Sequence, residues 1–147
     1  IVLFLIASPP FLSIFCAEPP LVLVSVAPYK FFIEKIAGDS VKVQLMVPAG
    51  ASAHTYEPTP KEILSAAKAA VWFCLGESFE ARAIASLKSH HPQMQVIDLR
   101  QNIDLIRTDP TIGCICCHGN GADLHIWLSL RQSEIQARTI AHTLCSL

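Results

Sequence analysis

Residues 21–47 read LVLVSVAPYKFFIEKIAGDSVKVQLMV, and this stretch decides the fold. Its first seven residues form a continuous apolar run of strand length, which indicates a strand covered on both faces. Pro28 suits the first turn of a helix, whose apolar residues recur at helical spacing until Gly38 ends it. Residues 41–47 alternate apolar and other side chains and predict a second strand. The stretch therefore predicts a strand–helix–strand unit, the building block of a parallel sheet.

The same alternation of strands and helices continues along the chain. Thr59, Pro60 and Glu62 predict a capping box at the start of a helix that runs from Pro60 to about Ala70. We therefore expect an α/β fold with a four-stranded parallel sheet and helices on both faces. The remaining expected elements are a strand over 71–75, a helix after Gly76 that His90-His91-Pro92 closes, a strand over 95–99, a loop over 100–122, and a last helix capped by Ser129 with Gln132.

The composition is that of an ordered globular chain. Of the 147 residues, 52 % are hydrophobic and 16 % are charged, which argues against disorder. This length allows one domain or one lobe of a two-lobed protein. The net charge of −1 gives no electrostatic case for nucleic-acid binding, because phosphate contacts need a basic surface.

The N-terminal segment, residues 1–17, carries no charge and reads IVLFLIASPPFLSIFCA. Its two adjacent prolines argue against a membrane-spanning helix, which needs about 20 apolar residues. The segment is typical of a secretory signal, so we expect residues 18–147 to work outside the cytoplasm. Two alternatives stay open: lipid attachment at Cys16, against which Phe15 argues, and a core strand.

Two short segments place a histidine next to an aromatic residue and a carboxylate. They are VPAGASAHTYEPTP at 47–60, which contains His54, and DLHIWLS at 123–129, which contains His125. Imidazole is the commonest protein ligand for zinc-like metals. His54 follows the second expected strand by seven residues, at the sheet edge where open α/β folds bind ligands. His54 and His125 are therefore candidate metal ligands.

Together the two histidine segments resemble the metal-binding loops of the zinc/manganese substrate-binding proteins of bacterial ABC importers, the cluster A-I type. The resemblance covers about residues 21–147. It implies that His54 and His125 bind Zn²⁺ or Mn²⁺, and that the chain is the N-terminal lobe of a two-lobed periplasmic binding protein. The matching segments beyond the two loops are Pro28-Tyr29, Ala37-Gly38-Asp39, residues 75–80 and residues 96–99.

The resemblance also implies a function and a partner. Members of this family capture a divalent metal outside the cytoplasm and deliver it to the membrane permease of an ABC importer, without catalysis. A second lobe supplies the remaining metal ligands, and the last helix of this chain resembles a truncated form of the helix that joins the lobes. The alternative from another class is a surface adhesin or interaction protein, because some relatives have been described that way.

Three residues near the histidines have candidate supporting roles. Glu57 is expected either to accept a hydrogen bond from the imidazole nitrogen that faces away from the metal or to be a surface carboxylate near a helix start. Asp123 is expected to orient a loop or a ligand. Trp127 is expected to pack beside His125 and shield the site from water. The other histidines outside the cysteine-rich segment, His90, His91 and His142, are interpreted as helix-end or surface residues.

A cysteine-rich segment precedes the second histidine. Cys114, Cys116, Cys117 and His118 fall within five residues. The resemblance implies a metal-collecting loop at this place, which is histidine-rich or acidic in many relatives. Thiolates, which prefer zinc and copper(I) to manganese, could serve the same purpose. A disulfide or an incidental thiol cluster is the alternative. A cysteine-dependent hydrolase has little support, because no cysteine has a distinctive spacing to a histidine and neither a phosphate loop nor His-Glu-x-x-His occurs.

Overall fold

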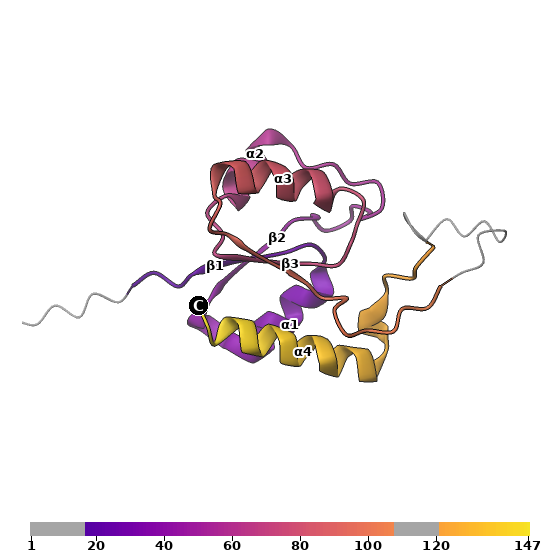
Figure 1. Cartoon of the computed structure of the whole chain (residues 1–147). Coiled ribbons are helices and arrows are strands. Elements are labelled where there is room, and N and C mark those ends of the chain that lie inside the picture. Colours follow the sequence, from indigo (N-terminus) through magenta and orange to yellow (C-terminus); the bar gives the residue numbers. More distant parts are fainter. Residues whose placement is uncertain (1–16, 108–120) are drawn as a thin grey trace, which may run out of the picture.

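The computed structural model describes residues 17–107 and 121–147, and a parallel sheet lies at its centre (Figure 1). All strand pairs are parallel, and the strand order is β2-β1-β3-β4. The two middle strands are buried on both faces, as their continuous apolar runs predict. The strands are β1 (Leu21–Val24), β2 (Lys42–Leu45), β3 (Val71–Cys74) and β4 (Gln95–Asp98).

Helices cover both faces of the sheet, which confirms the predicted α/β architecture. Helices α1 and α4 pack together on one face, and α2 and α3 pack together on the other (Figure 1). The α-helices are α1 (Ala27–Ala37), α2 (Pro60–Ala66), α3 (Glu80–His90) and α4 (Leu130–Leu144), and two 3₁₀ turns, η1 (Gly38–Ser40) and η2 (Ile126–Leu128), complete the described elements.

The core has two halves because successive strand residues point to opposite faces of the sheet. Val22 and Val24 of β1 pack with Tyr29 of α1 on one side. Leu23, between those two valines, packs with Leu87 of α3 on the other side. Each half of the core thus ties one helix layer to the sheet and fixes the loops that leave the strand ends.

The structure corrects two details of the expected helices. Helix α2 ends at Ala66 and not near Ala70, because the backbone N–H of Ala70 donates to the carbonyl of Leu21 and so joins the sheet (2.8 Å). Helix α4 begins at Leu130 as expected, but the Ser129 side chain makes no capping hydrogen bond, so the Ser129–Gln132 cap is wrong. The predicted Thr59–Glu62 capping box is present.

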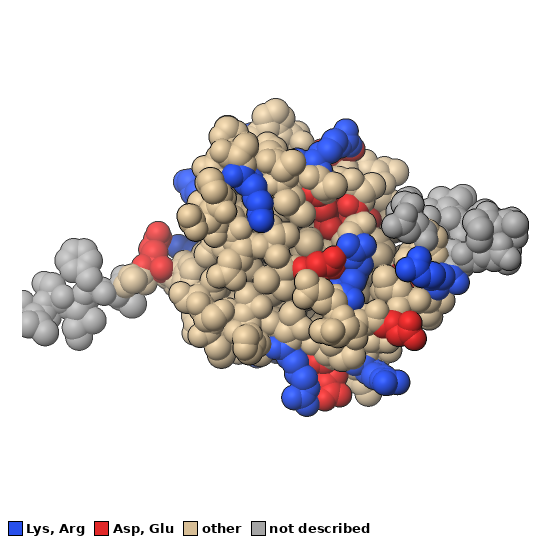
Figure 2. Space-filling view, in the orientation of Figure 1, with Lys and Arg blue, Asp and Glu red and all other residues tan. Residues whose placement is uncertain are grey.

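On the face in Figure 2, the described Lys and Arg side chains are scattered among uncharged residues and form no continuous basic stripe. Within residues 17–107 and 121–147, no helix is both long and apolar enough to cross a membrane. The first sixteen residues of the expected signal segment lie outside the described residues, as do Cys114, Cys116, Cys117 and His118.

Candidate metal centre

The loop after β2 carries His54 to the carboxyl edge of the sheet. Behind the histidine, the Tyr56 ring packs edge-to-face on Phe79, with ring centroids 5.2 Å apart. The Ser78 hydroxyl lies 3.5 Å from the carbonyl oxygen of His54, to which it donates. The segment that follows β3 therefore holds the His54 loop through both an aromatic contact and a hydrogen bond.

A buried carboxylate from the same segment faces the His54 ring. Glu77 Oε2 lies 3.3 Å from Nδ1 of His54, and the Glu77 side chain is only 2 % exposed. In a neutral ring, the tautomer with its proton on Nδ1 makes this hydrogen bond, and Nε2 then carries the lone pair. The His54 ring is therefore oriented by Glu77.

The turn that carries Glu77 is organised by a second buried carboxylate, Glu80. The backbone N–H groups of Leu75 and Glu77 donate to Glu80, each at 3.0 Å, and the Ser25 hydroxyl also donates to it. Burial raises the pKa of Glu80 above its ordinary value, while the hydrogen bonds from Ser25, Leu75 and Gly76 oppose that rise. Glu80 thus fixes the backbone conformation of the turn that contains Glu77.

The second histidine segment repeats this carboxylate–imidazole arrangement. Asp123 Oδ1 lies 2.8 Å from Nδ1 of His125 and also accepts the backbone N–H of His125 at 2.9 Å. These hydrogen bonds from His125 hold the pKa of Asp123 below its ordinary value. The Trp127 ring lies 5.2 Å from the His125 ring, centroid to centroid, and 6.0 Å from Tyr29. Asp123 therefore orients His125, and Trp127 covers its flank.

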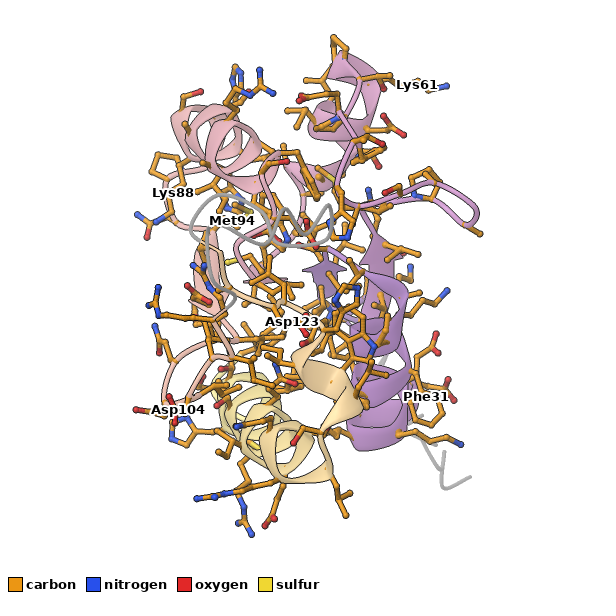
Figure 3. All side chains as sticks on the ribbon, turned by 90° about the vertical axis from the view of Figure 1, so that its right-hand side faces the viewer. Phe31, Lys61, Lys88, Met94, Asp104 and Asp123 are labelled. Atoms are coloured by element: carbon orange, nitrogen blue, oxygen red, sulfur yellow. The ribbon has the colours of Figure 1, made fainter. Side chains whose placement is uncertain are left out.

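The structure brings the two predicted histidines together although they lie 71 positions apart in the sequence. Their ring centroids lie 5.8 Å apart, with an angle of 71° between the planes. Figure 3 looks onto this edge of the sheet, with Asp123 near its middle, between the α2–α3 layer and the α1–α4 layer. Within the described parts of the chain, no three His, Cys, Asp or Glu side chains form a metal-binding group. The described site thus offers two imidazoles, each with one carboxylate.

A surface hollow of about 300 Å³ lies beside His125. Asp104, Ile106 and Asp123 are among its lining residues, and His54 is not. Asp104 lies toward the side of the face on which Asp123 is central (Figure 3). The hollow is therefore next to the histidine pair and does not enclose it.

One carboxylate near the site differs from the one that the sequence suggests. Glu57 is exposed and forms an ion pair with Arg82, while the carboxylate beside His54 is Glu77. The sequence pattern does not single out Glu77, because the residue falls in the turn that leads into a helix. Its position directly after β3, at the edge where ligands bind in open α/β sheets, was the signal that could have identified it.

Comparison with known proteins decides the family. The model of the family described as "Zinc-uptake complex component A periplasmic" matches residues 22–147. The chain belongs to this family. It is 38 % identical over 128 residues to the "Putative metal-binding protein" of Chlamydia muridarum, which covers 86 % of this chain and 42 % of that protein.

Two further relatives carry a metal in their names. The manganese ABC transporter substrate-binding lipoprotein ScaA of Streptococcus gordonii is 29 % identical over 115 residues, or 76 % of this chain and 36 % of ScaA. A zinc-bound crystal structure of a ZnuA deletion mutant superimposes with a TM-score of 0.74 at 33 % identity, over 88 % of this chain and 47 % of that one. This family member therefore spans less than half the length of these relatives and has the fold of one lobe.

Proposed function

We propose that residues 18–147 form the N-terminal lobe of an extracytoplasmic protein that captures a divalent metal and delivers it to the membrane permease of an ABC importer. The observation that carries the proposal is the approach of the His54 and His125 rings to 5.8 Å at the carboxyl edge of the sheet. The family of substrate-binding proteins to which the chain belongs supports the transport role. Binding and release are then the activity, and no chemical step is involved.

The two imidazoles suit one metal ion. Zinc–nitrogen bonds of about 2.0–2.1 Å place the ring centroids of two imidazoles on one tetrahedral zinc about 5 Å apart, close to the separation seen here. Glu77 and Asp123 each face a Nδ1 atom, so each ring presents Nε2 to the metal as a neutral ligand. Small side-chain movements therefore suffice for His54 and His125 to share a cation.

The remaining ligands come from outside the described part of the site. The curated relatives are more than twice as long as the matched segment, and we propose that a second lobe supplies those ligands and excludes water. In the isolated chain water fills these positions, and affinity is much weaker. Zn²⁺ is favoured over Mn²⁺ because imidazole nitrogen binds zinc more strongly. Cys114, Cys116, Cys117 and His118 are proposed to collect metal for this site.

Calorimetric zinc titration of the parent, His54→Ala and His125→Ala tests the proposal. The three thiols of the 114–117 segment would bind zinc themselves, so all proteins carry serine at Cys114, Cys116 and Cys117. We expect one zinc per parent chain and near-complete loss of binding in either variant. His142→Ala, an exposed histidine on α4, is the matched control and keeps the parent affinity.

Two results would contradict this function. Equal zinc affinity in the parent and both histidine variants would show that the site is elsewhere. Binding of a macromolecular partner that survives both chelation and loss of His54 would favour the adhesin or interaction role.

A further inference from the structure

Glu77 is the most deeply buried acidic group in contact with the histidine pair. Its side chain is 2 % exposed, whereas the Asp123 side chain, which has the equivalent place beside His125, is 40 % exposed. Its backbone is held on both sides by the turn, since Glu77 N–H donates to Glu80 and the Glu77 carbonyl accepts from the N–H of Glu80, each at 3.0 Å. The position of this carboxylate is therefore set by the fold.

A buried carboxylate is unfavourable unless a cation or several donors compensate its charge. Two arginines lie close to this turn among the described residues, one in α3 and one against Gly76, and both are bound to other carboxylates. Arg82 forms an ion pair with Glu57, and Arg100 forms a bidentate ion pair with Asp98. The hydrogen-bonding partner of the Glu77 side chain within residues 17–107 and 121–147 is His54, at 3.3 Å. Its negative charge is thus directed at the imidazole.

We propose that Glu77 is a positioning residue that keeps the proton of His54 on Nδ1, presents Nε2 to the metal and supplies negative charge that the bound cation compensates. This inference rests on the proposed function and deepens it. The carboxylate fixes the tautomer and the orientation of the imidazole, as carboxylate partners of metal-bound histidines do. Because Glu77 is shielded from water, its effect on an adjacent cation is screened less than that of an exposed carboxylate.

The sign of the effect on stability separates this role from a purely structural one. A residue needed only for folding would weaken metal binding by destabilising the metal-free protein. Glu77 should instead destabilise the metal-free protein, because a buried carboxylate beside a neutral ring is unfavourable before the cation arrives. Glu77→Gln removes the charge and keeps the shape, so the metal-free variant should melt at the same temperature as the parent or higher.

The experiment compares Glu77→Gln with Glu57→Gln, a matched control on an exposed, arginine-paired glutamate of the His54 loop. All proteins carry serine at Cys114, Cys116 and Cys117. We measure zinc affinity by calorimetry, the melting temperature of the metal-free protein, and the His54 tautomer from its ring ¹⁵N resonances. For Glu77→Gln we expect zinc affinity to fall about 10- to 100-fold, with a smaller share of the Nδ1-protonated tautomer. For Glu57→Gln all three quantities should match the parent.

The outcomes distinguish this inference from the proposed function. If the parent binds zinc through His54 and His125 while Glu77→Gln has the parent affinity and tautomer, the inference about Glu77 is wrong and the function stands. A lower melting temperature of metal-free Glu77→Gln with an unchanged His54 tautomer would also overturn it, in favour of a structural role. If the parent binds no zinc, the proposed function fails and the inference fails with it.

Discussion

At the scale of single residues, the two imidazoles have carboxylate partners of the same kind in different surroundings. Both Glu77 and Asp123 face a Nδ1 atom, but the Asp123 side chain is 40 % exposed and the Glu77 side chain is 2 % exposed. Water screens a charge at an exposed position more strongly than at a buried one. The two carboxylates should therefore contribute unequally to metal affinity.

Asp123→Asn tests the carboxylate that should contribute less to metal affinity. The asparagine oxygen can still accept the hydrogen bonds from His125, so only the charge is lost, and we expect zinc affinity to fall about 10-fold, at the low end for such partners. Asp104→Asn is the control, because Asp104 is exposed and lines the same hollow. Calorimetry that gives the two variants the same affinity would contradict the role assigned to Asp123.

At the scale of structural elements, the turn between β3 and α3 supports the site. Gly76 has φ +90°, a conformation that favours glycine, and an added Cβ would lie 2.1 Å from Nη1 of Arg100. The turn also contains Glu77 and the backbone donors that bind Glu80. A change at Gly76 should therefore affect both the stability of the protein and the position of Glu77 beside His54.

Gly76→Ala and Gly50→Ala form a matched pair for this turn. Gly50 has a similar φ of +85° but open space around the added Cβ. Gly50→Ala should lower the free energy of unfolding by about 1–2 kcal/mol from backbone strain alone. Gly76→Ala should lower it by more, because Arg100 must also move. Urea denaturation measures both, and equal losses would show that the Arg100 contact is unimportant.

The Asp98–Arg100 pair at the end of β4 should make the stability of the protein depend on pH. Burial by itself raises the pKa of Asp98, but the hydrogen bonds from Arg100 outweigh it and hold the pKa below its ordinary value of 3.8. A carboxyl group whose pKa is lowered by folding stabilises the protein above the unfolded pKa and loses that contribution as pH falls through the folded pKa.

Asp98→Asn should therefore be less stable than the parent by about 1 kcal/mol at pH 7. The difference should shrink as the pH falls below about 4. Urea denaturation of both proteins at several pH values measures it. A difference that is constant with pH would mean that the Asp98 charge contributes nothing.

Sequence patterns predicted the elements better than the contacts between them. The apolar runs gave β1 and β3, and the Thr59–Glu62 pair gave the start of α2, because these signals are local. The predicted end of α2 was wrong, because Ala70 forms a hydrogen bond with β1, a strand distant from it in sequence, and so cannot belong to the helix. Glu77 was overlooked for the same kind of reason, since its partner His54 is 23 residues away.

At the scale of the whole molecule, the strand order explains why the site forms. His54 follows β2, Glu77 follows β3, and His125 lies in the segment after β4 and before α4. Parallel strands place all three of these segments at one edge of the sheet (Figure 1). Sequence could predict that common edge from the alternation of strands and helices. It could not predict the 5.8 Å approach of the rings, which depends on how each loop packs.

The most direct test is a zinc titration of the chain, with serine at Cys114, Cys116 and Cys117, followed through the ring ¹⁵N resonances of all its histidines. We predict that the Nε2 signals of His54 and His125 shift together and stop changing at one zinc per chain, while His90, His91 and His142, which have no proposed role in metal binding, stay unchanged; His118 of the proposed metal-collecting segment is left out of this comparison. Shifts of only one of the two rings, or shifts that end at different zinc ratios, would contradict a single cation shared by both imidazoles.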